Sequence, residues 1–558
     1  MDAHEELIAL ADRYWDALLE AAPSDATLLG DRRFDDRIED LSVAAEERLL
    51  GTWRGLLSEV DALDPGRLGA EDRTTRSLLR TELASAVSHL EWRPIEMASD
   101  QMTGVHAGML TMAPLVNAPE PEHARKLLDR YRQFGTLMGQ AAERFRAGLA
   151  AGRTPAHITI ERSLNQLDSY LAADLADDPF AALAGPSDWD GESAWRAELT
   201  EVTRDIIRPA FAAYRAMLAT ELLPVARPDD RPGLCWLGDD GADIYDRLLR
   251  HHTTLPDLGA DEIHQLGLDE LAGLRAEYEE VGTRLFGLSD QTTIFARLRD
   301  DTALRYNAGE EIMSDARAYL AAAQAEMGNW FGRLPRQSCD ILPVPDFLAA
   351  DAPAAYYFPP AADGSRPGAY YVNLREPKSR NRYETAAVAY HEAIPGHHLQ
   401  LTIANELDHL PRFQRMSFSN TAFVEGWALY TERLADEMGL YTDDLARIGM
   451  LAADSWRSCR LVVDTGLHAK GWTRQQAIDF MVANAPVGVD EIIVEIDRYI
   501  AMPGQAVAYK VGQLEIRRQR AQVAERHGAA FDIKAFHDRV LGSGSVSLPV
   551  LRNLAGSL

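Results

Sequence analysis

Apolar residues recur along most of the chain at spacings of three and four, which is the period of an α-helix. The two clearest runs are Leu7, Leu10, Tyr14 and Leu18, and Leu271, Leu274, Tyr278 and Val281. Such stripes mark the buried face of an amphipathic helix. The pattern predicts a mainly α fold in which these positions are core contacts.

One segment has the pattern of a strand instead. Residues 369–374 are rich in β-forming side chains and follow Arg366-Pro367-Gly368, a turn-forming triplet. We expect a small antiparallel β-sheet here, beside a helix that carries His391. An edge strand at this place would bind an extended peptide by strand addition, with Tyr371 as a substrate contact. The alternative is a hairpin that has no role in binding.

Three stretches rich in Pro, Gly and Asp interrupt the helical pattern, at residues 177–192, 222–241 and 351–368. Chains of this size usually divide into lobes. We place the boundary in the second stretch, which gives a mostly helical lobe at residues 1–225 and a catalytic, zinc-binding lobe at residues 226–558. One continuous two-lobed domain is the alternative.

Composition narrows the possible partners and the compartment. The net charge of −29 argues against nucleic acid as a partner. The three cysteines, Cys235, Cys339 and Cys459, are too sparse for a disulfide framework. The first residues lack a signal-peptide pattern, and no apolar stretch reaches the length of a membrane span. These observations predict a cytoplasmic protein with no membrane partner, and they do not predict its oligomeric state.

The segment from His391 to His398 contains the groups of a zinc hydrolase site. A catalytic zinc needs three protein ligands and an open position for water, and a nearby carboxylate such as Glu392 is the usual general base. In the common pattern a second His follows the first by four residues. That position is Pro395 in this chain, which cannot ligate a metal and interrupts a helix.

The choice of the second ligand depends on this interruption. On an unbroken helix His397 would point about 120° away from His391, and His398 would lie about 10 Å further along the axis. A kink at Pro395-Gly396 would bring either histidine into place. From the residues alone both remain open, as does an ordinary kinked helix with a surface His pair.

A third ligand is provided by Glu425, a single carboxylate in the apolar run at residues 423–430. A carboxylate in such a run is costly unless it is paired or bound to a metal. The stretch between His397 and Glu425 is long enough for a loop and a return helix. Glu432 shares the helical face of Glu425 and could orient a ligand histidine. The alternative is a solvated charge.

The chain resembles the bacterial family known as domain of unknown function 885, whose signature reads H-E-x-x-P-G-H-x-x-Q. The matching positions are His391, Glu392, Pro395, Gly396, His397 and Gln400. Similar stretches extend from residues 26–30 to residues 498–509. The resemblance implies a zincin-like, mostly helical peptidase architecture with a deep channel, zinc as cofactor, and His397 as the second ligand.

Four residues downstream of the ligands are further candidates. Related helical peptidases place a Tyr or His near the metal to stabilise the oxyanion, and Tyr509 is the first choice here and His468 the second. Arg498 could hold a substrate carboxylate through its planar fork, with Tyr499 beside it as a second substrate contact. For each of them the alternative is a polar residue that is satisfied within the core.

We therefore expect a gluzincin-type metallopeptidase that cleaves short peptides. Its zinc would be held by His391, His397 and Glu425, and Glu392 would act as general base on the zinc-bound water. The alternatives are an amidase acting on a small non-peptide amide and a non-catalytic peptide-binding protein with a degenerate zinc site. An intact Glu392 favours catalysis, because a binding protein needs no base there.

Overall fold

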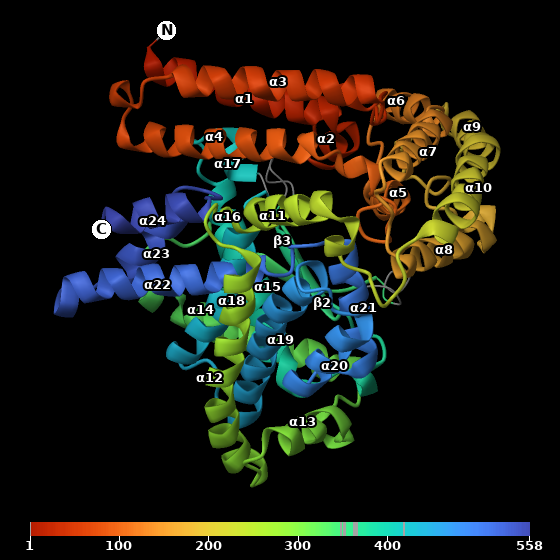
Figure 1. Ribbon diagram of the computed structural model, residues 1–558. Coiled ribbons are helices and arrows are strands. Elements are labelled where there is room, and N and C mark those ends of the chain that lie inside the picture. The colour runs from red at the N-terminus through yellow and green to blue at the C-terminus, as the bar shows by residue number, and fades with distance from the viewer. Residues whose placement is uncertain (1, 346–348, 350–352, 361–365, 417–418) are drawn as a thin grey trace.

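A computed structural model of the chain describes residues 2–345, 349, 353–360, 366–416 and 419–558. The fold is mainly α with one small sheet, as predicted (Figure 1). The helices are α1 (Ala3–Ala21), α2 (Pro23–Leu28), α3 (Val43–Ala62), α4 (Ala70–Glu91), α5 (Val105–Met112), α6 (Pro121–Tyr131), α7 (Phe134–Ala150), α8 (His157–Ala172), α9 (Glu192–Val202), α10 (Arg208–Met217), α11 (Asp239–Thr253), α12 (Ala260–Phe286), α13 (Gln291–Asp300), α14 (Gly309–Trp330), α15 (Thr385–Glu392), α16 (His397–Asn405), α17 (Arg412–Met416), α18 (Thr421–Glu437), α19 (Asp444–His468), α20 (Arg474–Asn484), α21 (Val489–Ala501), α22 (Ala508–His527), α23 (Ile533–Leu541) and α24 (Leu548–Gly556). Within the described part of the chain, no helix is both long and apolar enough to cross a membrane.

The N-terminal helices α1, α3 and α4 lie across one end of the molecule (Figure 1). In α1 the predicted stripe is buried at Leu7, Leu10 and Tyr14, each at most 5% exposed, and Leu18 is partly buried. These side chains belong to the same hydrophobic core as residues of α11 to α24. The first helices therefore pack as part of the main body.

Helices α5 to α10 form a separate bundle beside this body (Figure 1). They enclose a second hydrophobic core, in which the rings of Phe134, Phe180 and Phe211 contact one another. The division into residues 1–225 and 226–558 stays a prediction. What the burial shows is that this bundle has a core of its own, whereas α1 to α4 share the main one.

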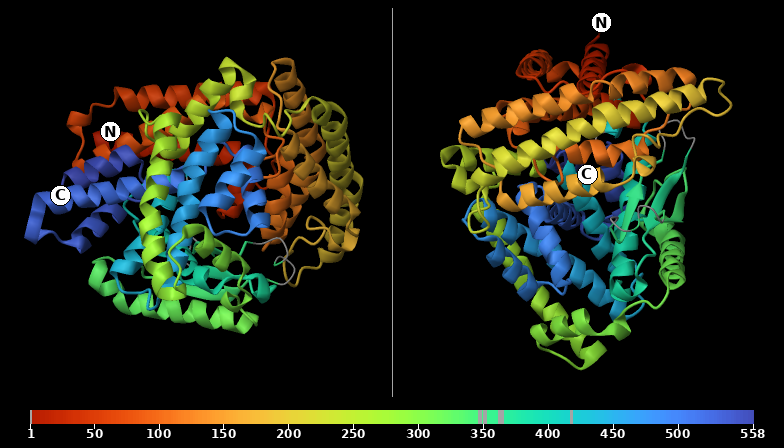
Figure 2. Two further views of the ribbon diagram at one scale, coloured as in Figure 1. Left: turned by 60° about the horizontal axis from the view of Figure 1, so that its bottom comes forward. Right: turned by 90° about the vertical axis from the view of Figure 1, so that its right-hand side faces the viewer.

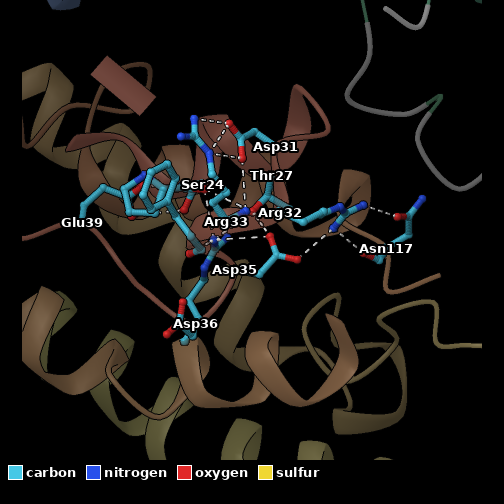
Figure 3. Close-up of polar contacts among 12 residues, drawn as sticks. Ser24, Thr27, Asp31, Arg32, Arg33, Asp35, Asp36, Glu39 and Asn117 are labelled. Carbon is cyan, nitrogen blue, oxygen red and sulfur yellow. Dashed lines mark hydrogen bonds and ion pairs between the residues drawn. The ribbon is translucent and has the colours of Figure 1, made fainter. Parts of the chain in front are cut away.

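Several polar contacts connect the bundle to its surroundings, and two of them are of particular interest. Buried Asp497 of α21 accepts hydrogen bonds from Arg162 of α8 at 2.7 Å and from Arg474 at 2.6 Å. The second joint links α2 and the turn that follows it to Arg130 of α6. Figure 3 shows the α2 side of this joint, with Thr27 and Asp35 labelled.

The sheet has three strands, β1 (Cys339–Pro343), β2 (Ala355–Phe358) and β3 (Gly368–Val372), in the order β1-β3-β2. β2 is antiparallel to β3, but β1 is parallel to it. The predicted antiparallel sheet is therefore wrong, and the sheet is mixed. The chain between β1 and β3 includes β2, which leaves enough length for a parallel return.

The predicted strand at residues 369–374 corresponds to β3, which is the central strand and not an edge. Both of its edges are paired, so a peptide cannot add to it, and the edge that remains beside the metal-binding helices belongs to β2. Helix α14 packs on β1 and β3, whereas α15 contacts β2 and α16 contacts β3 (Figure 2, right). This packing places the edge strand next to Glu392.

Candidate metal centre

The predicted kink is a complete break between two helices. α15 ends at Glu392 and α16 begins at His397, with a cis peptide bond at Ile394-Pro395 between them. Gly396 allows the chain to turn back against α15, because a Cβ atom there would lie only 1.9 Å from the carbonyl oxygen of His391. The break brings His397 back beside His391.

Three side chains converge at this break. The Nε2 atoms of His391 and His397 each lie 3.5 Å from Oε2 of Glu425 in α18. The two imidazole rings are nearly perpendicular, with centroids 4.8 Å apart. Ligands at tetrahedral angles around zinc, with bonds of about 2.05 Å, would be about 3.3 Å apart. The three residues therefore fit a small divalent cation with little movement, and their donor set suits zinc.

Glu432 orients one of these ligands. Its Oε1 lies 2.8 Å from Nδ1 of His391, and both side chains are at most 5% exposed. A carboxylate on Nδ1 fixes the proton there and directs Nε2 to the metal. The contact confirms the partner that was suggested by the helical spacing of Glu425 and Glu432.

The electrostatics of the group depend on the opposing effects of burial and charge. Burial alone would lower the pKa of His391, but the bonds to Glu425 and Glu432 outweigh it and raise that pKa to about 9. Burial would raise the pKa of Glu425, whereas His391 and His397 hold it well below its usual range. The carboxylates thus stabilise a positive charge at this place. In the metal-free protein that charge is the proton on His391, and a bound metal cation would take its place.

Glu392 lies outside the three-ligand group, although it is the next residue after His391. Its Oε2 accepts a hydrogen bond of 3.0 Å from the backbone N–H of Tyr357 in β2. The carboxylate is therefore held between the candidate metal centre and the edge strand. The role of Glu392 as a general base stays a prediction.

His398 points to the sheet instead of the metal centre. Its Nδ1 lies 2.9 Å from the hydroxyl of Tyr357, and its Nε2 lies 3.2 Å from the carbonyl oxygen of Gln337. Burial lowers the pKa of His398 to about 4. Of the two histidines that the sequence left open, His397 is the one that joins His391 and Glu425.

His468 is fully engaged by the backbone. Its Nδ1 accepts a hydrogen bond from the N–H of Leu234 at 3.2 Å, and its Nε2 donates to the carbonyl oxygen of Tyr499 at 2.9 Å. Neither nitrogen is left for a substrate oxyanion. This arrangement gives no support to the catalytic role that the sequence suggested for His468.

The three remaining downstream candidates lie together in one cluster. They are Arg498, Tyr499 and Tyr509. Arg498 donates to Glu495 at 3.2 Å and to Gln505 at 2.6 Å. The hydroxyl of Tyr499 donates to Glu495 at 2.5 Å and accepts from Arg460 at 2.8 Å. The ring of Tyr509 stacks on the guanidinium of Arg460 at 4.6 Å.

Arg460 is a residue of this cluster that the sequence reasoning missed. It is buried in α19 and directly precedes the apolar run Leu461-Val462-Val463. The same signal that marked Glu425, a single charge beside an apolar helical run, would have identified it.

The predicted substrate contact Tyr371 lies in β3, outside this cluster. Its ring is stacked on that of Tyr356, with ring centroids 5.0 Å apart.

The deep channel that the family resemblance implies is a further prediction. A cavity of about 550 Å³ lies among α1, α3, α4 and α7, and it is lined by residues such as Leu49, His89 and Arg144. None of the residues that line this cavity belongs to the metal centre. The channel therefore stays a prediction.

The fold and the site together define a class: a mainly helical protein with a buried His-His-Glu group, able to hold a metal ion, and a further carboxylate beside it. The chain belongs to the bacterial family described as "Bacterial protein of unknown function (DUF885)", which it matches over residues 23–554. The family suggested by the signature is thus confirmed.

Two solved structures resemble this chain over nearly its whole length. The "putative lipoprotein from Colwellia psychrerythraea" is 25% identical, with 100% of this chain and 99% of the other covered and a TM-score of 0.91. A "putative lipoprotein of unknown function from Shewanella oneidensis" is 20% identical, with 98% of each chain covered and a TM-score of 0.76. A comparison with curated proteins gave no match.

Proposed function

We propose that the protein is a zinc-dependent hydrolase that cleaves peptide bonds in short peptides. The observation that carries the proposal is the separation of roles at the break between α15 and α16. His391, His397 and Glu425 form the ligand group, while Glu392 stays outside it and is held by the edge strand. Three ligands and one free carboxylate are the parts of a catalytic zinc site rather than of a structural one.

Zinc bound here would polarise both the attacking water and the scissile carbonyl. Glu392 would take a proton from that water and pass it to the leaving amine. Tyr357 would steady Glu392 through its backbone N–H. Tyr509 stays the proposed oxyanion donor, because its hydroxyl makes no hydrogen bond to any other described residue and its ring is held by Arg460.

Two alternatives remain from the sequence. An amidase acting on a small non-peptide amide would use the same groups, so only the substrate separates it from a peptidase. A peptide-binding protein with a degenerate zinc site is disfavoured by Glu432, because a carboxylate on Nδ1 of His391 is the partner of a working metal ligand.

Two observations favour different cellular locations, and we propose both locations for testing. The sparse cysteines favour the cytoplasm, whereas the name of the similar Colwellia psychrerythraea protein favours a lipid-anchored protein of the cell envelope. Fractionation of cells that produce the full-length protein separates the two proposals, since an anchored protein would sediment with membranes.

Replacement of the base tests the proposal. Glu392→Gln should keep zinc and fold but lose about 10²- to 10⁴-fold in hydrolysis, measured by mass spectrometry on a peptide mixture. Glu437→Gln, a change on the surface of α18 where Glu437 pairs with Arg520, is the matched control and should stay active. Loss of zinc from Glu392→Gln would make Glu392 a ligand and contradict the mechanism.

A further inference from the structure

A row of arginines extends from the metal centre along α19 to α21. Arg457 lies 3.9 Å from Oε1 of Glu432, the carboxylate that orients His391. Trp456 connects Arg457 to Arg460, because both guanidinium groups lie 5.0 Å from its ring centroid. The row thus begins directly behind a proposed zinc ligand.

The far end of the row is fixed by one carboxylate. Glu495 accepts hydrogen bonds from Arg460 at 2.9 Å and from Arg498 at 3.2 Å. Tyr499 donates to the same carboxylate and accepts from Arg460. Arg460 is only 5% exposed, whereas Arg498 is 17% exposed. Arg460 therefore holds its neighbours in place from the interior, and Arg498 is the more accessible of the two side chains.

Arg457 has fewer close anions than Arg460 and Arg498, because its nearest carboxylate among the described residues is that of Glu432 at 3.9 Å. Its Nε and the Nη1 of Arg460 are buried without a hydrogen-bond partner among the described residues. Uncompensated buried charge is strongly unfavourable. In a chain with a net charge of −29, the unused donors of Arg457 and Arg460 mark this place as a candidate site for an anionic ligand.

Two nearby carboxyl groups do not supply that anion. Arg457 acts electrostatically on Glu384 and Glu491, but neither forms an ion pair with it within 4.0 Å. Burial and the proximity of Glu384 and Glu495 raise the pKa of Glu491 to about 7. Burial also raises the pKa of Glu384, so both carboxyl groups have a reduced tendency to carry charge.

We propose that Arg457 and Arg498, supported by Arg460, bind a carboxylate of the substrate. Guanidinium groups bind carboxylates through paired hydrogen bonds. Only Glu432 separates Arg457 from His391, so the bound carboxylate would lie within a few residues of the cleaved bond, at about 3.5 Å per extended residue. This inference rests on the proposed hydrolase, and it makes the substrates peptides that are cleaved near a free C-terminus.

The test uses binding to metal-free protein, so that it does not depend on turnover. Full-length protein stripped of metal is equilibrated with a mixture of di- and tripeptides, each present as the free acid and as the C-terminal amide. Retained peptides are identified by mass spectrometry. A third set, amidated peptides that contain Asp or Glu, separates a terminal carboxylate from a side-chain one.

Free acids should be retained at least tenfold over their amides, and Arg457→Gln should remove that preference. Arg447→Gln, on the same helix but paired with Asp436, should leave it unchanged. Equal retention of acids and amides, retention of neither, or retention only of the acidic amides would overturn the proposal. The comparison of acids with amides on the wild-type protein holds even if Arg457→Gln does not fold.

A separate measurement of zinc content keeps the two proposals distinct. Protein that binds zinc but does not prefer free acids would contradict only the carboxylate subsite. Protein that prefers free acids but cannot bind zinc would contradict the hydrolase while leaving the arginine row as a carboxylate site.

Discussion

At the scale of single residues, the metal centre depends on the proton position of one imidazole. His391 can present Nε2 to a metal only if its proton stays on Nδ1, and Glu432 holds it there at 2.8 Å. Partners of this kind tune the basicity and orientation of a ligand without touching the metal. We therefore expect Glu432 to contribute to the affinity for a metal, although it is not one of the three proposed ligands.

Glu432→Gln should weaken zinc binding by about 10- to 100-fold while the fold is kept. Competition with a chromophoric zinc chelator measures the change. Glu437→Gln on the same helix serves as the control and should bind zinc like the wild type. An unchanged affinity in Glu432→Gln would mean that the carboxylate only fills space in the core.

The pKa of His391 predicts how zinc binding responds to pH. In the metal-free protein this pKa is raised to about 9. At neutral pH the imidazole of His391 is therefore protonated on both nitrogens and carries a positive charge. Zinc requires the neutral form and must displace that proton. Apparent affinity should therefore rise about tenfold per pH unit up to pH 9 and level off above it, as measured in chelator-buffered zinc. A flat profile between pH 7 and pH 9 would contradict the raised pKa.

The residues of the centre were predictable because zinc chemistry restricts the side-chain types. His391, Glu392 and Glu425 stand out as charged or polar groups in apolar runs. The choice of His397 needed the family signature, because helix geometry alone left His398 open. Arg460 could have been found as a charge beside an apolar helical run, but its pairing with Glu495 and that of Arg457 with Glu432 join α18, α19 and α21, which are distant in sequence.

At the scale of elements, the position of Glu425 depends on a close crossing of α18 and α22. A Cβ atom added to Gly512 would lie 1.7 Å from the carbonyl oxygen of Ala422, and one added to Gly426 would lie 2.5 Å from Gly512. The two backbones therefore touch beside the third ligand. Larger residues at the crossing would separate the helices.

Gly512→Ala should lower stability by about 2 kcal/mol or more, because backbone must move to admit the methyl group. It should also weaken zinc binding, since Glu425 moves with α18. Thermal unfolding and zinc titration check both effects. Gly273→Ala in α12, where a Cβ meets nothing within 4 Å, is the control and should be neutral or stabilising. A Gly512→Ala protein with normal stability would show that the crossing can relax freely.

The helices were more predictable than the sheet. Apolar stripes of α1 and α12 mark helices through local periodicity alone, and both are buried as expected. The pairing in the sheet depends on β1 and β2, which have no comparable signal and meet β3 only through the folded chain. Strand order and direction therefore could not be read from the segment at residues 369–374.

At the scale of the whole molecule, the bundle with the second core is attached through a buried polar joint (Figure 3). Arg130 of α6 donates to the hydroxyl of Thr27 at 2.8 Å and to the carbonyl oxygen of Phe34 at 2.9 Å. Thr27 in turn donates to fully buried Asp35 at 2.6 Å. This joint gives a structural reason for the family-like stretch at residues 26–30.

Arg130→Met should destabilise the protein by about 2–4 kcal/mol, because it leaves the buried carbonyl oxygens of Pro23 and Phe34 without this donor. Asp35 keeps Arg32 as a cation at 3.4 Å. Zinc content per folded molecule should stay normal, since the metal centre belongs to the other core. Calorimetry and metal analysis on one preparation test both statements. Arg132→Met, which removes surface ion pairs to Asp129 and Glu198, should change stability by less than about 1 kcal/mol. Equal effects of the two substitutions would contradict the joint.

The most direct test of a metal held by His391, His397 and Glu425 is a crystal structure of protein supplied with zinc, with anomalous diffraction measured on both sides of the zinc absorption edge. The account predicts one strong peak about 2.0–2.2 Å from Nε2 of each histidine and from a carboxylate oxygen of Glu425, and no ligation by Glu392. An empty site at full zinc saturation, or a peak held by His398 or Glu392 instead, would contradict it.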